Sequence, residues 1–358
     1  MVKRILDSIL NYPLPAIVAG IGLAFVAMQS LVFSMQIAGY VLIASAVFIA
    51  LLQGQKVSLG PKWAYIPILL IVGSVVARAV VYQPDTAIYE LGFMGLMFGA
   101  YMAGRVCGKQ LFWAVAPMVI IISISVYISA FTFPGKPTGG ILDGLNYNLT
   151  AATLIIGTLI ATWDRKWLLV VIALPAVFLT GATEGIVVLG IVGLMVLLRA
   201  DWNIRMLVPA GAVGIALIVL VGTGALGSLH SRTGEIAEAA INGEESGAIS
   251  NRLDGYKFAL QDVSILGHGY QPLFTDRDSI HNVPLRVLYE LGPVAMLAWC
   301  GVIVMGVVKG RYKYAIGAII VFSMFDHLAW TWLAPFSMAI VGASTIEDRN
   351  DLLFRRQE

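Results

Sequence analysis

Charge is scarce in this chain. Only 12% of its 358 residues are Asp, Glu, Lys or Arg, whereas 59% are hydrophobic and the mean hydropathy is +0.85. Soluble globular domains are about one-quarter charged, so a water-soluble fold of this size could not cover its surface with so few charges. The composition therefore indicates an all-α polytopic membrane protein.

The chain also has few cysteines and almost no net charge, and each of these features argues against a class of function. The two cysteines, Cys107 and Cys300, lie in or beside apolar runs and form neither a disulfide framework nor a metal-ligand spacing. The net charge is only +2, from 23 Lys and Arg against 21 Asp and Glu. A nucleic-acid binder would concentrate basic residues on one face, so this class is disfavoured.

Apolar runs divide the chain into about twelve expected spans, since a transmembrane helix needs about 20 mostly apolar residues. The expected spans are 13–34, 37–53, 63–82, 87–104, 111–133, 149–163, 167–182, 185–198, 206–227, 283–308, 314–327 and 329–345. They define three regions. Nine spans occupy residues 1–227, one long loop occupies 228–282, and three spans with a tail occupy 283–358.

The positive charges between these spans predict the orientation. If the N-terminus is cytoplasmic, every short inner loop carries at least two Lys or Arg residues, as the positive-inside rule requires. The even number of spans then places both termini in the cytoplasm. The long loop 228–282 and all four histidines fall on the outer face, so we expect any chemistry to be periplasmic.

The outer loop contains an expected amphipathic helix that opens with Ser250 and has Asn251 as its N-cap. This places Arg252 in the first turn, where a cation is unusual because a helix N-terminus favours anions. An arginine beside free backbone N–H groups would make a good phosphate site. The alternative is an exposed arginine at the membrane interface.

Three short motifs follow this helix in the sequence. They are Gly267-His268-Gly269, His281-Asn282 and Glu290-Leu291-Gly292. With Arg252 before them, their order, spacing and position resemble the signature region of the O-antigen ligase and O-antigen polymerase family. These are membrane glycosyltransferases of the GT-C type that use undecaprenyl-diphosphate-linked sugars. The resemblance is concentrated in residues 250–294, and Asn148 at the start of a span resembles a further family position.

This resemblance implies a GT-C-like bundle in a bacterial inner membrane that transfers a glycan from an undecaprenyl-diphosphate donor to a sugar hydroxyl. The acceptor would be a glycan or a lipid A core, as in lipopolysaccharide biosynthesis, and ligase and polymerase both remain open. Arg252 would bind the diphosphate and His281 would act as the base. The other expected substrate-binding residues are Gly267, Gly269, Asn282, Asn148, Arg286 and Arg78. No cofactor, metal or nucleic acid is expected.

One position departs from the family pattern. Glu184 stands where the family commonly carries an arginine that is thought to bind the diphosphate. Arg78 lies in the outer half of a span and is the candidate replacement, since an ionisable residue within a span is a functional hypothesis by default. A salt bridge from Arg78 to Asp85 or Glu90 is an equally good interpretation.

Two further alternatives remain at the level of the sequence. Arg286 and Glu290 are four residues apart and can form a purely structural ion pair on one helix face. A transporter or flippase for polysaccharides or lipid-linked glycans would also have about twelve spans. Transporters tend to show repeated halves and broken helices, and no internal repeat is visible in this sequence. A membrane scaffold is the third possibility, and the ordered motifs count against it.

Overall fold

The computed structural model describes residues 13–27, 33–55, 57–82, 86–133, 139–140, 147–182, 185, 188, 190, 247–269, 280, 282–325 and 333–346. These ranges contain α-helices and one short 3-10 helix, and no strand occurs in them. The all-helical architecture expected from the composition is therefore confirmed for this part of the chain.

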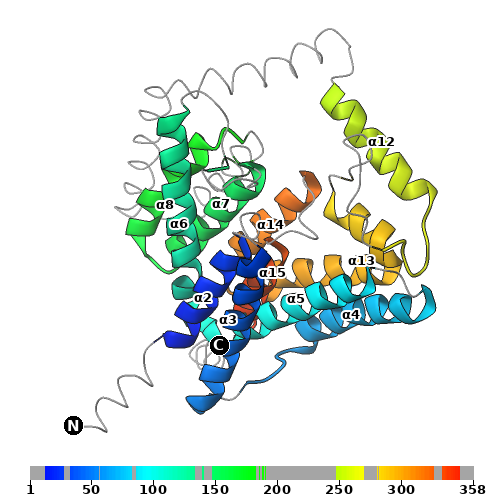
Figure 1. Ribbon diagram of the computed structural model, residues 1–358, viewed down its shortest axis with the longest axis horizontal. Helices are drawn as coiled ribbons and strands as arrows, with labels where there is room; N and C mark the ends of the chain where they lie inside the picture. The colour runs from blue at the N-terminus through cyan, green and yellow to red at the C-terminus, as the bar shows by residue number, and fades with distance from the viewer. Residues whose placement is uncertain are drawn as a thin grey trace, which may run out of the picture.

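The helices follow one another in the order shown in Figure 1. They are α2 (Leu14–Ala27), α3 (Phe33–Leu52), α4 (Lys62–Tyr82), α5 (Ala87–Cys107), η2 (Gly108–Gln110), α6 (Leu111–Thr132), α7 (Tyr147–Trp163), α8 (Trp167–Leu179), α12 (Gly247–Gln261), α13 (Val283–Lys309), α14 (Lys313–Phe325) and α15 (Leu333–Ser344).

Ten of these helices coincide with expected spans. The expected spans 185–198 and 206–227 fall largely or wholly outside the described residues. The first expected span, 13–34, differs in its end, because residues 33 and 34 already belong to α3. Three helices, α4, α6 and α13, are long and apolar enough to cross a membrane. The apolar helices α2, α7, α8, α14 and α15 are shorter.

The helices pack through an apolar core in which small residues let backbones approach closely. α15 lies against α5, where an added Cβ on Gly104 would overlap the backbone of Ala339 and one on Gly342 would overlap the backbone of Tyr101. Small residues at helix interfaces are typical of membrane bundles, because packing replaces the hydrophobic driving force there. α4 runs beside α13 and also contacts α5, and α6, α7 and α8 form a neighbouring group (Figure 1).

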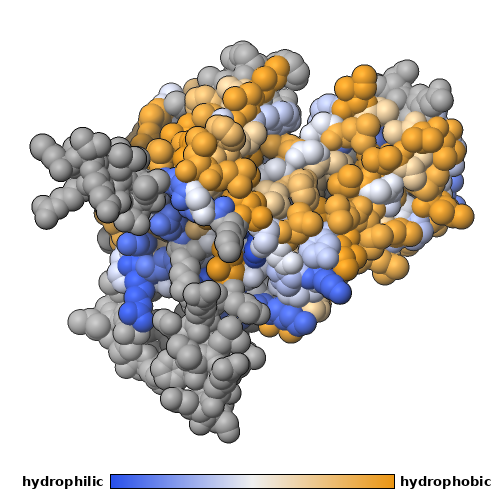
Figure 2. All heavy atoms as spheres, turned by 90° about the horizontal axis from the view of Figure 1, so that it is seen from below, coloured by the Kyte–Doolittle hydropathy of each residue, from blue (hydrophilic) through white to orange (hydrophobic). Residues whose placement is uncertain are grey.

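Large apolar side chains also cover much of the outside. Ile88, Leu168 and Val80 are 86%, 76% and 70% exposed, and Figure 2 shows broad hydrophobic areas over one face of the molecule. A soluble monomer rarely exposes apolar patches of this extent. The exposed surface is therefore that of a helical membrane protein.

α12 differs from the sequence expectation at its start. The helix begins at Gly247, so Asn251 lies inside it and not at its N-cap. An N-cap preference is worth about 1 kcal/mol, and the helical residues 247–251 supply backbone hydrogen bonds that compete with it. Arg252 accordingly lies in the second turn. The interpretation that free N–H groups of the first turn assist Arg252 is wrong.

Contacts divide the charged residues between two ends of the bundle. At one end, here called the motif end, the end of α4 meets the start of α5, residues 267–269 and the start of α13. At the opposite end, Arg105 on α5 donates to the Ser58 carbonyl at 3.2 Å, and the Tyr312 hydroxyl donates to Asp164 at 3.3 Å. The loops that meet there are those that the positive charges assign to one side of the membrane.

Candidate functional site at the motif end

The site begins with a break in α13. Gly292 adopts φ 84° and ψ 173°, which is not helical, and Pro293 follows it. Because proline has no N–H, it cannot donate to the carbonyl of Tyr289 one turn earlier. The break also separates the Glu290 carbonyl from its helical donor. Two buried carbonyls therefore need partners from elsewhere in the chain.

The Gly-His-Gly segment provides these partners. The backbone N–H of His268 donates to the Tyr289 carbonyl at 2.9 Å, and that of Gly269 donates to the Glu290 carbonyl at 2.9 Å. Gly267 has φ 73°, and a Cβ on it would overlap the backbone of Glu290. The segment is thus docked by its backbone onto the kink, and glycine is required at position 267 for both its conformation and its closeness.

Arg78 is the charged centre of the motif end. Its side chain is 2% exposed and forms an ion pair with Glu90, which is fully buried at the start of α5. The Thr86 hydroxyl donates to the same carboxylate at 2.8 Å. A Cβ on Gly269 would overlap the Arg78 guanidinium, so the Gly-His-Gly segment lies directly over this arginine.

A second buried ion pair lies on α13. Arg286 Nε donates to Glu290 Oε1 at 3.0 Å, and both side chains are buried. Glu290 also attracts Arg78 electrostatically. The two arginines and two glutamates therefore form one neutral cluster, in which each charge is offset by another, as burial in a low-dielectric interior requires.

Asn282 fixes the beginning of α13. Its side-chain oxygen accepts from the Leu285 N–H at 3.0 Å, which makes it the helix N-cap, and its amide donates to the Met324 carbonyl of α14 at 3.3 Å. These bonds occupy both ends of the Asn282 amide. The residue therefore holds the start of α13 against α14, directly after position 281.

His268 is held in place by packing. Its ring stacks on Tyr289 with the centroids 4.5 Å apart, and Nε2 lies 2.8 Å from the Asp262 carbonyl. The Asp262 carboxylate lies 3.6 Å from the same nitrogen, so His268 is a loop residue fixed by its neighbours.

The structure brings together only part of the predicted set. Arg78, Gly267, Gly269, Asn282 and Arg286 meet at the motif end. Asn148 is the second residue of α7 and is half-buried. His281, Glu184, Asp85 and the side chain of Arg252 lie outside the described residues. The candidate pairing of Arg78 with Glu90 is confirmed, as is the Arg286–Glu290 pair.

The docking of the backbone of residues 267–269 onto α13 was not predicted from the sequence. The signal was available, since Gly292-Pro293 inside an apolar run predicts a kink with an unpaired carbonyl. No signal identified residues 267–269 as the segment that satisfies it. In the described part of the chain, no group of three or more His, Cys, Asp or Glu side chains could hold a metal ion.

No protein-family model matches the chain, and no curated protein matches it.

Proposed function

We propose that the chain is an integral membrane glycosyltransferase of the O-antigen ligase or polymerase type, acting at the periplasmic face of the bacterial inner membrane. One observation carries the proposal. The Gly-His-Gly segment and the Glu-Leu-Gly break of α13 are separate in sequence but meet beside buried Arg78, and α13 itself begins directly after position 281. These are the segments in which the family resemblance is concentrated.

The proposed reaction has simple requirements. A hydroxyl of the acceptor sugar attacks the anomeric carbon of the donor, the bond from that carbon to the diphosphate oxygen breaks, and undecaprenyl diphosphate leaves. His281 takes the proton of the hydroxyl, for which an imidazole with an ordinary pKa of about 6.5 is suited. Arg252 neutralises the leaving diphosphate through its planar, always-charged guanidinium.

Arg78 is proposed to supply the charge that Glu184 does not. It already has a partner in Glu90, so a diphosphate would have to share the guanidinium or replace the carboxylate. Gly269 lies directly against the Arg78 guanidinium. A donor approaching Arg78 from that side would have to displace residues 267–269.

The kink in α13 also bears on a transporter or flippase, because broken helices often bind cargo or ions through freed carbonyls. Here the Tyr289 and Glu290 carbonyls already accept from His268 and Gly269. Backbone N–H groups of the same chain thus already satisfy these carbonyls, which favours the transferase over the transporter.

The test uses the full-length protein, purified and reconstituted with an undecaprenyl-diphosphate-linked glycan and an acceptor. We expect His281→Ala to abolish transfer and Arg252→Lys to lose most of it, because a point charge cannot replace a bidentate guanidinium on a diphosphate. The matched controls are His230→Ala, in the same outer loop, and Arg355→Lys, near the C-terminus; both should retain activity. Full activity of both His281→Ala and Arg252→Lys would refute the proposal, as would movement of the glycan across the bilayer without transfer.

A further inference from the structure

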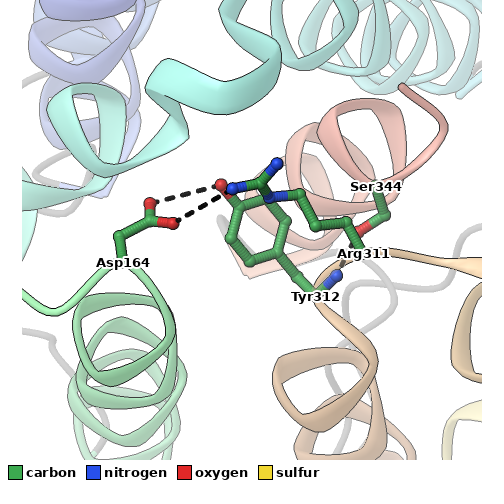
Figure 3. Close-up of polar contacts among 4 residues, drawn as sticks. All are labelled: Asp164, Arg311, Tyr312 and Ser344. Atoms are coloured by element: carbon green, nitrogen blue, oxygen red, sulfur yellow. Dashed lines mark hydrogen bonds and ion pairs between the residues drawn. The ribbon is translucent and has the colours of Figure 1, made fainter. Parts of the chain in front are cut away.

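The loops α7–α8 and α13–α14 form a cationic surface at the end of the bundle opposite the motif end. Within 163–168 and 308–314 there are five cations, namely Arg165, Lys166, Lys309, Arg311 and Lys313, and one acid, Asp164. The loops are in contact, since the Tyr312 hydroxyl donates to Asp164 (Figure 3). The rings of Trp163 and Tyr314 are also only 6.2 Å apart. We name these eight cationic and ring-bearing residues, together with Asp164, the basic–aromatic patch.

The single acid of the patch is already used. Arg311 Nη2 lies 3.8 Å from Asp164 Oδ1, and Tyr312 donates to the other carboxylate oxygen. The Arg311 and Tyr312 N–H groups are in turn held by Ser344, at 3.2 Å and 3.3 Å respectively (Figure 3). The remaining four cations therefore give this surface a net positive charge.

Arg165 is held in a conformation that an arginine does not favour. Its φ of 58° is in the left-handed region, and it is the only non-glycine residue with positive φ among those described. This conformation costs an ordinary side chain about 1–2 kcal/mol, and glycine would adopt it freely. An arginine at this turn gives up stability and places an exposed charge at the tip of the loop. Such a local cost is typical of a functional position.

The surroundings of the patch are those of a membrane interface. Trp163 is exposed and stands next to the charges, while Lys166 and Lys313 lie 5.7 Å and 5.5 Å from the rings of Phe112 and Tyr314. Leu168 and Val308, which flank the cations in sequence, are 76% and 69% exposed. A soluble anion would make no favourable contact with these exposed apolar side chains. A phospholipid, in contrast, places its phosphate beside cations and its acyl chains beside apolar side chains.

We infer that the basic–aromatic patch is a binding site for an anionic phospholipid of the bilayer, with its headgroup between the α7–α8 and α13–α14 loops. The phosphate is attracted by Arg165, Lys166 and Lys309, and the acyl chains lie along the exposed apolar starts and ends of α8 and α13. A bound lipid would join two loops from distant parts of the sequence. This inference is independent of glycan transfer.

The experiment measures quenching of tryptophan fluorescence in the reconstituted full-length protein. The probe is brominated phosphatidylglycerol in phosphatidylcholine bilayers, compared with brominated phosphatidylcholine. The contribution of Trp163 is obtained by difference from a Trp163→Phe variant. We expect brominated phosphatidylglycerol to quench Trp163 at a lower mole fraction than brominated phosphatidylcholine does.

The variant Arg165→Asn/Lys309→Gln should weaken the preference for phosphatidylglycerol about thirtyfold, since each cation near a membrane surface contributes about one kcal/mol toward anionic lipid. Asparagine tolerates the left-handed conformation. The single variant Arg165→Gly suits the backbone even better, so it should lower the preference without loss of thermal stability. The control Lys62→Gln/Lys257→Gln removes the same charge from exposed positions outside the patch and should leave the preference unchanged.

Three results would overturn the inference. The first is equal quenching by the two brominated lipids in the wild type. The second is an equal loss of preference in the control, which would indicate a general charge effect. The third is abolition of the preference by inorganic phosphate at constant ionic strength, which would identify a site for soluble anions.

Discussion

The two ends of the bundle hold their charges in different ways. At the motif end, Arg78, Glu90, Arg286 and Glu290 lie within helices, are buried, and balance one another in a neutral cluster. At the opposite end the charges lie mainly in loops, several are exposed, and cations outnumber the single acid of the patch. Only exposed charge can remain unbalanced, because an isolated buried ion costs several kcal/mol.

The two ends also differ in what their charges do: those at the motif end hold helices together, and those at the opposite end can attract an anion. The motif end is held by paired charges and by backbone bonds to a helix break, so its parts are fixed relative to one another. The opposite end combines a few hydrogen bonds, such as Tyr312 to Asp164, with free positive charge that can attract an external anion. The first arrangement suits a chemical site and the second suits contact with a lipid surface.

The largest expected effect is the loss of a carboxylate at the motif end. Glu90→Ala leaves Arg78 buried without its ion-pair partner, and breaking a buried pair from one side costs about 3–5 kcal/mol. We expect a loss near the lower limit, because Glu290 still attracts the guanidinium. The free energy of unfolding by SDS titration measures this loss.

The matched change at the opposite end is Asp164→Ala, which removes a carboxylate from a more exposed pair and should cost less. The double variant Arg78→Met/Glu90→Ala removes both buried charges and should recover part of the stability. A larger loss for Asp164→Ala than for Glu90→Ala would reverse the comparison between the two ends.

An intermediate effect is expected from the glycine that docks on the kink. Gly267→Ala places a side chain in the left-handed region, which costs about 1–2 kcal/mol, and its Cβ would also overlap the Glu290 backbone. We expect lower thermal stability and faster amide exchange at positions 268 and 269, whose N–H groups bond to α13.

The control for Gly267→Ala is Gly301→Ala on α13, where nothing lies within 4 Å of the added Cβ. Alanine is the better helix former, so this variant should be as stable as the wild type or more stable. Unchanged exchange at 268 and 269 in Gly267→Ala would show that the segment does not depend on the kink.

The smallest effect is a pH dependence at the opposite end. Burial raises the pKa of the Asp164 carboxyl above its usual value, and Arg311 and Tyr312 offset this only in part. The folded chain therefore keeps this proton to a higher pH than the unfolded chain does. The contribution of Asp164 to stability falls as the pH rises from about 4 through the raised pKa.

Asp164→Asn removes this titration and retains an acceptor for Tyr312. The stability of the wild type relative to the variant should decrease across that pH window, measured by thermal unfolding in detergent at several pH values. Parallel pH profiles for the two proteins would contradict the assigned cause.

Some features of the fold and the site followed from local sequence. Apolar runs of sufficient length predicted twelve spans, ten of which coincide with described helices, because a span requires only length and apolar composition. The spacing of four residues between Arg286 and Glu290 predicted their ion pair, because helical periodicity places both on one face. The position of Arg78 within a span did not distinguish between substrate binding and a structural salt bridge. The start of α12 was predicted too late, because the N-cap preference of Asn251 is weak compared with continued helical bonding.

The sequence by itself determined an apolar helical protein with its charges sorted between two sides, since composition and helix period are properties of the chain alone. Only the tertiary structure decided that Gly269 lies over Arg78, that residues 267–269 satisfy the carbonyls of α13, and that Asp164 meets Tyr312 across 148 positions. Each of these depends on which segments pack together. A buried donor or charge requires some partner, and the packing of the helices selects which one is within reach.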